Sequence, residues 1–386
     1  MTDSLNDFVT NREVQPQDNP VLQGNFAPVD VENSFEQLEV VGTIPKDLQG
    51  TLLRTGPNPV DPGANHHWFL GDGMLHGIQL RNGKAMSYRN RWVRTKALEE
   101  KTGIPAAKGG SQLELFTQGS GNVNVVGHGD RVLALPEQGL PYEMDMQLNT
   151  KGLYDYAGKL RSSMTAHPKI DGRTGQMLFF GYEVLEPLVR YHEASANGDL
   201  VKTIDIELPK SIMMHDFGVT ETRVVFMDLP ILFDLELVEK GFGFPFQWSD
   251  SHQSRLGIMN RSSDADTVQW IDIDPCFVFH PLNSYDDGDK IVMDVVRYSK
   301  MMAAPGDHDY EKGTNLVRWV IHPNAGTVET TVLSDIDIEF PRVNPRFECY
   351  KHRFGYALKQ GGAHGFSDLV KFDLVAGTTQ TYQVGD

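Results

Sequence analysis

Three of the 13 histidines in this chain stand in a sequence setting that suits metal chemistry. They are His167 in SSMTAHPKI, His215 in SIMMHDFGVT and His280 in PCFVFHPLNSY. Each closes a short run of apolar or small residues and precedes a residue that breaks or bends the chain. Neutral imidazole binds zinc, copper, iron and nickel, whereas calcium and magnesium prefer oxygen ligands. The three histidines therefore indicate either a transition-metal site or three core histidines, each hydrogen-bonded to a carbonyl group.

Other histidines favour ordinary roles. His128 falls in a predicted hairpin loop, and His322 ends a predicted strand before a turn. Seven more lie in glycine-, aspartate- or serine-rich stretches that predict loops: His66, His67, His76, His252, His308, His352 and His364. We expect surface or hydrogen-bonding roles for all of these residues.

Strands must position the three histidines, because hairpin patterns recur along the chain from about residue 38. In each pattern a Gly, Asn or Asp cluster separates two segments rich in β-branched or aromatic residues. Six stretches show it: LRNGKAMSY, VGHGDRVLALP, KIDGRTGQMLFFGYEV, ANGDLVKTIDIELP, DDGDKIVMDVVRY and PNAGTVETTVLSD. The stretch TRVVFMDLPILFDLEL continues this β-rich character, whereas ALEEKTGIPAA predicts one short surface helix. The sequence therefore predicts an all-β protein.

The spacing of the histidines helps to choose among a large sandwich, a barrel and a β-propeller. A propeller blade takes about 40–50 residues, and His167, His215 and His280 are 48 and 65 residues apart. This spacing fits one histidine from each of three successive blades, with the longer interval absorbing a loop. Residues 239–266 carry little strand pattern and are the predicted loop.

Composition excludes several classes of protein. The 386 residues are 40% hydrophobic and 23% charged, which is typical of a soluble globular protein. Lys+Arg 35 against Asp+Glu 52 gives a net charge of −17, which argues against a nucleic-acid partner. The two cysteines, Cys276 and Cys349, cannot form a disulfide framework and suit a reducing compartment, so we expect a cytoplasmic location.

The N-terminal segment is polar and acidic, without a cationic start or an apolar stretch. It predicts a flexible arm over residues 1–25 and not a signal peptide. No part of the sequence approaches the roughly 18 consecutive apolar residues of a membrane-spanning helix. Contact with a membrane surface is compatible with this composition, but a membrane span is not.

Six motifs occur in a fixed order along the chain: TLLRTGPNP, HHWFLGDGMLHG, TAHPK, MMHDFGVT, FHPLNSYDDGD and EFPRVNP. Together they resemble the carotenoid cleavage oxygenase family, which includes apocarotenoid oxygenases and the retinal-pigment isomerase. The resemblance extends from about residue 26 to the last residue. It implies a single seven-bladed β-propeller domain over residues 26–386 and a non-haem Fe(II) centre.

In the resembled family four histidines hold the iron on the propeller axis, and His167, His215 and His280 match the first three. Family glutamates that orient the imidazoles match Glu137 in ALPEQGLPY and Glu339 in DIEFPRVNP. A carboxylate that accepts the far N–H of an imidazole fixes its tautomer and raises its basicity. The resemblance implies that Glu137 pairs with His215 and Glu339 with His280, leaving His167 without a glutamate partner.

One departure from the family concerns the end of the chain. The family's fourth histidine follows a further acidic turn, and the sequence ends at KFDLVAGTTQTYQVGD before either motif. We therefore expect a C-terminally truncated chain, with an incomplete final blade, open strand edges, weak iron binding and little activity. His322, His352 and His364 lie outside the family's final motif and are poor substitutes for the fourth ligand.

The resemblance implies a dioxygenase that cleaves an electron-rich conjugated double bond with O₂ into two carbonyl products, without a reducing cosubstrate. A carotenoid or apocarotenoid is the favoured substrate. Stilbene-cleaving relatives carry a lysine directly before the first of these glutamates, where this chain has Pro136. Because proline offers no cation to the phenol of such a substrate, a stilbenoid or phenylpropanoid alkene is only the alternative substrate. A non-catalytic propeller or an isomerase is the alternative function.

Residues 229–248, LPILFDLELVEKGFGFPFQW, concentrate apolar side chains. Because members of the resembled family take hydrophobic substrates from membranes, this segment is either a peripheral membrane contact or part of the core between blades. Its large apolar residues are Ile231, Leu232, Phe233, Phe242, Phe244, Phe246 and Trp248.

Overall fold

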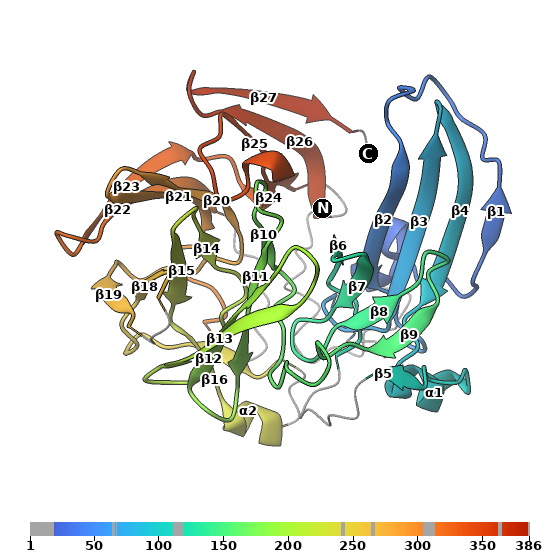
Figure 1. Ribbon diagram of the computed structural model, residues 1–386, viewed down its shortest axis with the longest axis horizontal. Helices are drawn as coiled ribbons and strands as arrows, with labels where there is room; N and C mark the ends of the chain where they lie inside the picture. Colours follow the sequence, from blue (N-terminus) through green and yellow to red (C-terminus); the bar gives the residue numbers. More distant parts are fainter. Residues whose placement is uncertain are drawn as a thin grey trace. The chain divides into compact units, whose positions relative to one another are not determined.

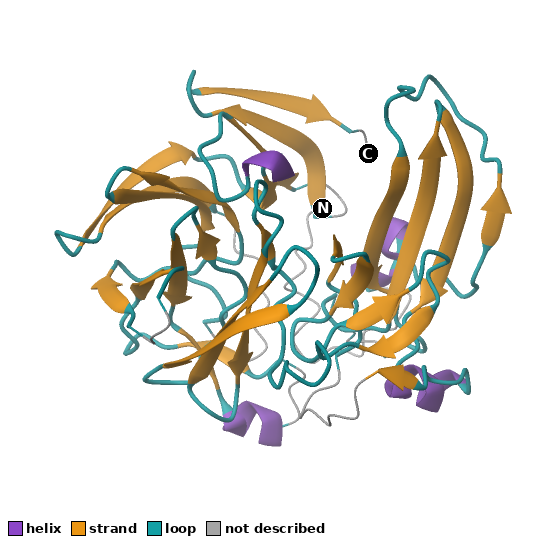
Figure 2. Ribbon diagram, in the orientation of Figure 1, coloured by secondary structure: helices purple, strands orange, loops and turns teal. Residues whose placement is uncertain are grey.

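The computed structural model describes residues 19–63, 66, 68–110, 119–240, 244–263, 267–303, 313–361 and 365–384. Their backbone divides into two compact units. The N-terminal unit is built from residues within Asn11–Ala166 and Ser195–Leu200, and the C-terminal unit from residues within His167–Ala194 and Val201–Asp386. The single propeller domain expected for residues 26–386 stays a prediction. Strands dominate the described residues, with only short helices between them (Figure 2).

The N-terminal unit contains two sheets. The first has the strand order β1-β4-β3-β2, from β1 (Ser34–Glu36), β2 (Gly50–Pro57), β3 (Gly73–Arg81) and β4 (Lys84–Trp92). The second has the order β5-β9-β8-β7-β6, from β5 (Gly109–Gly110), β6 (Asn124–His128), β7 (Arg131–Leu135), β8 (Tyr142–Met144) and β9 (Thr150–Leu153). All neighbouring strands are antiparallel except the parallel pair β5 and β9.

The C-terminal unit contains four four-stranded sheets that follow one another in chain order, coloured green through red in Figure 1. The first two comprise β10 (Lys169–Ile170), β11 (Met177–Glu183), β12 (Leu188–Ala194) and β13 (Leu200–Glu207), then β14 (Gly218–Val219), β15 (Arg223–Asp228), β18 (Arg255–Asn260) and β19 (Gln269–Asp272). The last two comprise β20 (Pro281–Asp287), β21 (Lys290–Arg297), β22 (Asn315–His322) and β23 (Thr327–Ser334), then β24 (Ile338–Arg342), β25 (Phe354–Gln360), β26 (Phe366–Asp373) and β27 (Thr378–Gln383).

Tight turns join most of these strands, as the hairpin patterns predict. The β3–β4 turn places Asn82 and Gly83 at φ 52° and 75°, and the β6–β7 turn places Gly129 and Asp130 at φ 55° and 62°. Positive φ at both central residues is the geometry of the type I′ hairpin, which favours Asn, Asp and Gly. All six predicted hairpins are present, and their turn residues favour them locally.

An insertion separates β15 from β18 in the second sheet of the C-terminal unit. It contains β16 (Ile231–Phe233), the helix α2 (Leu235–Glu239) and β17 (Phe246–Trp248), and β16 pairs with β17 in a small sheet of its own. The side chain of Asp234 caps α2 by accepting a hydrogen bond from the Glu236 backbone N–H. The loop predicted over residues 239–266 is therefore wrong in part, because β17 and β18 fall within it.

Short helical segments complete the structure. The predicted surface helix is α1 (Lys96–Thr102), which begins after the capping residue Thr95 and ends at Gly103 in the left-handed conformation. Three 3₁₀ turns are also present: η3 (Pro20–Leu22), η4 (Gly24–Phe26) and η5 (Pro345–Phe347). Among the described residues no helix is long and apolar enough to cross a membrane. The predicted arm over residues 1–25 lies largely outside the described residues.

The central strands of the C-terminal unit carry its core. Every residue of β15 is buried, as are six of the seven residues of β11, because both faces of these strands pack against neighbouring sheets. This packing explains why residues 224–227, VVFM, form a continuous apolar run between Arg223 and Asp228 and not an alternating pattern. The first strands of adjacent sheets also lie in contact, β14 with β20 and β20 with β24. Residues that precede or belong to these first strands are therefore brought together.

Candidate metal centre

His167, His215 and His280 occupy equivalent places in three successive sheets of the C-terminal unit. His167 lies two residues before β10, His215 three residues before β14, and His280 immediately before β20. The expectation of one histidine from each of three successive sheets agrees with these positions. The longer interval between His215 and His280 contains the β16–α2–β17 insertion.

The three imidazoles converge on one point. One nitrogen of each ring lies within 4.8 Å of the others, and the Nε2 atoms of His215 and His280 face each other at 3.2 Å. The ring centroid of His167 lies 4.4 Å from that of His215 and 4.7 Å from that of His280. No other cluster of histidine, cysteine or carboxylate side chains with metal-binding geometry occurs among the described residues.

A carboxylate orients one of the rings. The Nδ1 atom of His280 lies 2.7 Å from Oε2 of Glu339 in β24, and Tyr298 donates a hydrogen bond of 2.9 Å to the other carboxylate oxygen. The backbone N–H of Phe340 also donates to Oε2 of Glu339. With its Nδ1–H held by this carboxylate, His280 directs the lone pair of Nε2 toward His215.

Burial fixes the protonation states that metal binding needs. Burial, reinforced by the neighbouring imidazoles of His215 and His280, holds the pKa of His167 well below its usual value. Burial likewise lowers the pKa of His280, although Glu339 opposes the shift. Burial alone would raise the pKa of Glu339, but His280, Phe340 and Tyr298 together hold it below its usual value. The site therefore combines neutral imidazoles at His167 and His280 with an ionised carboxylate.

These residues fit a transition metal. The lone pairs of two nitrogens 3.2 Å apart repel each other unless a proton or a cation lies between them, and burial disfavours the proton. A divalent ion bound by three neutral imidazoles would satisfy all three nitrogens at once. Two apolar rings lie against the cluster. Phe279 packs edge-on against His215, and the ring centroid of Phe340 lies 5.4 Å from that of His280.

Glu137, the other predicted orienting glutamate, lies in the N-terminal unit just after β7. Its predicted pairing with His215 stays a prediction. Pro136, which occupies the position of the lysine in stilbene-cleaving relatives, is buried.

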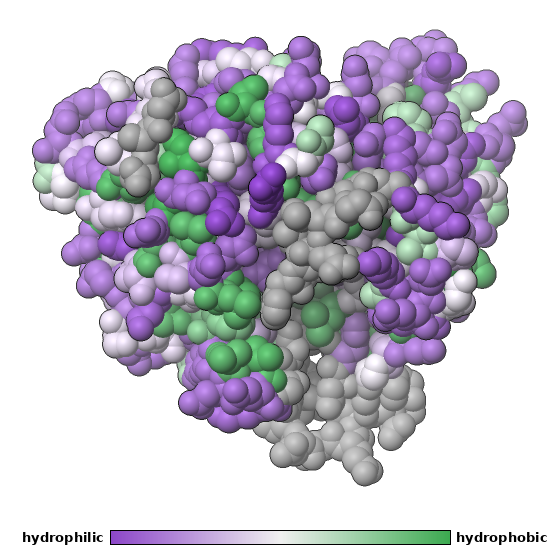
Figure 3. Space-filling model, turned by 60° about the horizontal axis from the view of Figure 1, so that its bottom comes forward, coloured by the Kyte–Doolittle hydropathy of each residue, from purple (hydrophilic) through white to green (hydrophobic). Residues whose placement is uncertain are grey.

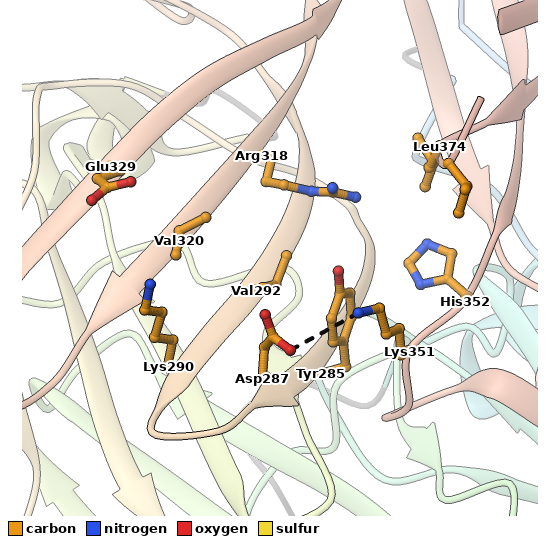
Figure 4. A pocket seen from close by; sticks show the side chains of 11 residues that line it. Tyr285, Asp287, Lys290, Val292, Arg318, Val320, Glu329, Lys351, His352 and Leu374 are labelled. Atoms are coloured by element: carbon orange, nitrogen blue, oxygen red, sulfur yellow. Dashed lines mark ion pairs between the residues drawn. The ribbon is translucent and has the colours of Figure 1, made fainter. Parts of the chain in front are cut away.

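The remaining histidines lie elsewhere. His352 is buried beside Asn283 and 3.7 Å from Asp294, and it lines a separate cavity of about 360 Å³ with Tyr285 and Arg318 (Figure 4). It is not part of the metal cluster, so it cannot act as a fourth ligand in this arrangement.

Two other histidines contact carboxylates. His322 contacts Glu329 at 3.1 Å, and His252 contacts the buried Asp228 at 2.6 Å. His76 lies within β3 and His128 ends β6, so the loops predicted at both positions are wrong. Three others lie outside the described residues: His67, His308 and His364.

Sequence reasoning missed two features of the site. Tyr298, which holds Glu339, follows an ordinary strand sequence and carries no local signal. Lys169 and Asp216 form a buried ion pair, with Nζ 2.7 Å from Oδ1, directly beside the segments that carry His167 and His215. In the sequence, only the positions of Lys169 within TAHPK and of Asp216 within MMHDFGVT indicated that these residues lie near the histidines.

Comparison with known proteins identifies the family. The model of the retinal pigment epithelial membrane protein family matches residues 26–386. A carotenoid cleavage oxygenase from Mycobacterium tuberculosis is 35% identical over 429 aligned positions, which cover 96% of this chain and 85% of that protein.

Solved structures show the same relationship. The lignostilbene dioxygenase from Pseudomonas brassicacearum has a TM-score of 0.84 and 30% identity, covering 95% of this chain and 84% of that one. Cobalt-substituted Synechocystis ACO has a TM-score of 0.83 and 25% identity, covering 97% and 85%. By this likeness the fold class is a β-propeller, with six sheets of four or five strands among the described residues, where the resemblance implied seven blades. The chain belongs to the carotenoid cleavage oxygenase family, whose curated members are oxidoreductases.

Proposed function

We propose that this protein is a non-haem Fe(II) dioxygenase that cleaves a conjugated carbon–carbon double bond of a carotenoid or apocarotenoid. The observation that carries the proposal is the converging cluster of His167, His215 and His280, in a chain that belongs to a family of carotenoid cleavage oxygenases. The reaction balances without a further reductant, because one alkene and one O₂ molecule yield two carbonyl products. Iron is proposed from the family, since three imidazoles alone would also bind other transition metals.

Each residue of the site has a defined task in this proposal. His167, His215 and His280 would hold the metal, which when bound supplies the activation of O₂. Glu339 keeps the proton of His280 on Nδ1, so that Nε2 faces the centre of the cluster. Tyr298 holds the carboxylate in place, and the rings of Phe279 and Phe340 keep the surroundings apolar. No acid–base pair is required, because the substrate itself provides the electrons.

The test uses the purified 386-residue chain loaded with Fe(II) under anaerobic conditions. We expect bound metal by elemental analysis and, on addition of an apocarotenal and O₂, two carbonyl products with one O₂ consumed per alkene cleaved. His215→Ala is the matched control, because it removes one ligand and should abolish both metal retention and cleavage. A wild-type chain that retains metal but isomerises the polyene without aldehyde formation would contradict the proposal.

A stilbenoid alkene is the second candidate substrate, because a solved structure with 30% identity is a lignostilbene dioxygenase. The buried Pro136 argues against it, since proline offers no cation to a phenol. Parallel assays with an apocarotenal and with a hydroxylated stilbene of equal concentration separate the two. Preference for the stilbene would replace the carotenoid assignment while leaving the metal centre intact.

We also propose delivery of the substrate from a membrane surface, in a protein located in the cytoplasm. The segment 229–248 is less available for docking than its composition suggests, because Ile231 and Phe246 are buried in the core. The partly exposed Phe244 and Trp248 pack against that core, and Phe242 lies outside the described residues. The more accessible apolar side chains belong to α2, where Leu235 is 56% exposed and Val238 44% exposed.

The surface seen in Figure 3 carries apolar side chains in several separate patches among hydrophilic residues. Liposome flotation of Leu235→Ser/Val238→Ser against wild type tests the membrane contact, with Phe244→Ser as a second variant. Equal flotation of all three proteins would dismiss the contact.

The proposed cytoplasmic location is supported by the two cysteines, which are both buried and free, as suits a reducing compartment.

A further inference from the structure

The segments that carry His167 and His215 are held by little regular structure. Each leads into a first strand of only two residues, Lys169–Ile170 in β10 and Gly218–Val219 in β14. By contrast, His280 precedes the seven-residue strand β20 and is oriented by Glu339. Two-residue strands supply few backbone hydrogen bonds, and the bond from the Met213 N–H to the Ile231 carbonyl ties the His215 segment to β16 and not to the His167 segment.

A buried ion pair connects these two segments. Nζ of Lys169 lies 2.7 Å from Oδ1 and 2.9 Å from Oδ2 of Asp216, and the two side chains are only 14% and 1% exposed. Lys169 is two residues after His167, and Asp216 directly follows His215. Oδ1 of Asp216 also accepts the backbone N–H of Phe217 at 2.7 Å, which fixes the carboxylate relative to its own backbone.

A second carboxylate secures the Lys169 side of this connection. The backbone N–H of Ile170 donates to Oε2 of Glu348 at 3.3 Å, and Glu348 follows the turn η5 in the last sheet. The short strand β10 is therefore attached by side chains to two other segments, the one that carries His215 and the one that follows η5. Desolvation of the two charges offsets much of their attraction, so a gain in stability alone does not explain a buried ion pair at this position.

We propose that the Lys169–Asp216 ion pair positions the metal centre by fixing the distance between the segments that carry His167 and His215. The inference rests on the proposed function, because it assumes that these histidines hold a metal. Neither residue contacts the metal in this proposal. They act through the backbone, and the ion pair selects a geometry that the two short strands cannot impose.

The experiment compares Lys169→Met with a matched control, Arg318→Met. Arg318 forms a comparable buried ion pair with Asp294, with Nε 2.7 Å from Oδ1, but belongs to β22 and is not part of the histidine cluster. Both variants should be destabilised, since each leaves a buried carboxylate without its cation. Only Lys169→Met should bind cobalt(II) more weakly, by about 10–100-fold in a titration followed by ligand-field absorption, as for other residues that orient metal ligands. Lys169→Arg keeps the charge and should restore most of the affinity.

Hydrogen exchange of the metal-free proteins provides a readout that does not depend on metal binding. Amides in residues 165–170 and 213–217 should exchange faster in Lys169→Met than in Arg318→Met. If Lys169→Met does not fold, Asp216→Asn replaces it, because it keeps the volume and an acceptor for Phe217.

Unchanged cobalt affinity and unchanged exchange in Lys169→Met would overturn the inference, as would an equal loss of affinity in Arg318→Met. A wild-type chain that binds no cobalt would count against the proposed function instead. In that case the exchange experiment alone decides whether the ion pair positions these segments.

Discussion

The Nδ1 atom of His280 lies 2.7 Å from Oε2 of Glu339, and the other oxygen of that carboxylate accepts a hydrogen bond from Tyr298. The three residues come from separate places, since His280 precedes β20, Tyr298 follows β21 and Glu339 belongs to β24. The contact therefore joins the third and fourth sheets of the C-terminal unit at the metal centre. Removal of this contact should lower metal affinity more than it lowers the free energy of unfolding.

Replacing Glu339 with glutamine keeps the volume but removes the negative charge that holds the Nδ1 proton of His280. We expect metal affinity to fall by about 10–100-fold, because the imidazole loses both its orientation and part of its basicity. Competition with a chelator of known affinity measures this loss. Glu329→Gln, at an exposed carboxylate on β23, is the control and should bind metal like wild type. Equal affinities of both variants would remove Glu339 from the site.

Replacing Tyr298 with phenylalanine deletes one donor to the Glu339 carboxylate and leaves His280 untouched. A buried hydrogen bond to a charged group is worth about 1.5–3 kcal/mol, so the free energy of unfolding should fall by about that amount. Metal affinity should fall less than in Glu339→Gln. Urea unfolding and metal titration of the same samples separate the two effects, and a larger loss of affinity than in Glu339→Gln would contradict this order.

His192 should make the protein less stable in acid. Burial lowers its pKa from 6.5 to about 3, so between these values the unfolded chain binds a proton that the folded chain does not. Stability is complete above pH 6.5 and falls as the pH decreases toward 3. At pH 5 this one group costs about 2 kcal/mol. Urea unfolding at pH 7 and at pH 5 measures how far the free energy of unfolding falls between these pH values. In His192→Asn this fall should be smaller by about 2 kcal/mol. An identical pH dependence in both proteins would refute the assignment.

Gly218 allows the first strands of two sheets to approach each other. A methyl group at this position would lie 2.8 Å from Oγ of Ser284 and 3.0 Å from Sδ of Met293. Gly218→Ala should therefore destabilise the protein by about 1–3 kcal/mol and weaken metal binding, because it separates β14 from β20 beside His215. Gly56→Ala, whose added methyl group meets no atom within 4 Å, is the control. Thermal unfolding and metal titration measure both changes.

The sequence predicted what depends on local chemistry. Turn residues such as Asn82 and Gly83 specify hairpins, and three histidines that close apolar or small-residue runs predicted side chains contributed by successive sheets. The pairing of Glu339 with His280 came from family resemblance, since nothing near Glu339 in the sequence distinguishes it from a surface carboxylate.

Other features depend on packing between sheets. Lys169 and Asp216 are 47 residues apart, and their contact exists only because the first and second sheets lie together. Tyr298 likewise gains its role only from the position of Glu339. The helix α2 was missed because its five residues lie within a long apolar run, where a single capping aspartate is a weak signal.

The placement of one histidine before the first strand of each successive sheet also has a consequence for the order of folding. His167 and His280 are 113 residues apart, so we expect the cluster to form only after two complete sheets and the insertion have packed together. Contacts of such long sequence separation form late, because the intervening chain must lose its entropy first. We therefore expect a metal ion added during refolding to find no complete site until the third sheet has docked. The rate of metal uptake should then report the rate of this last assembly step. We expect it to be slower than the formation of strand structure in each hairpin.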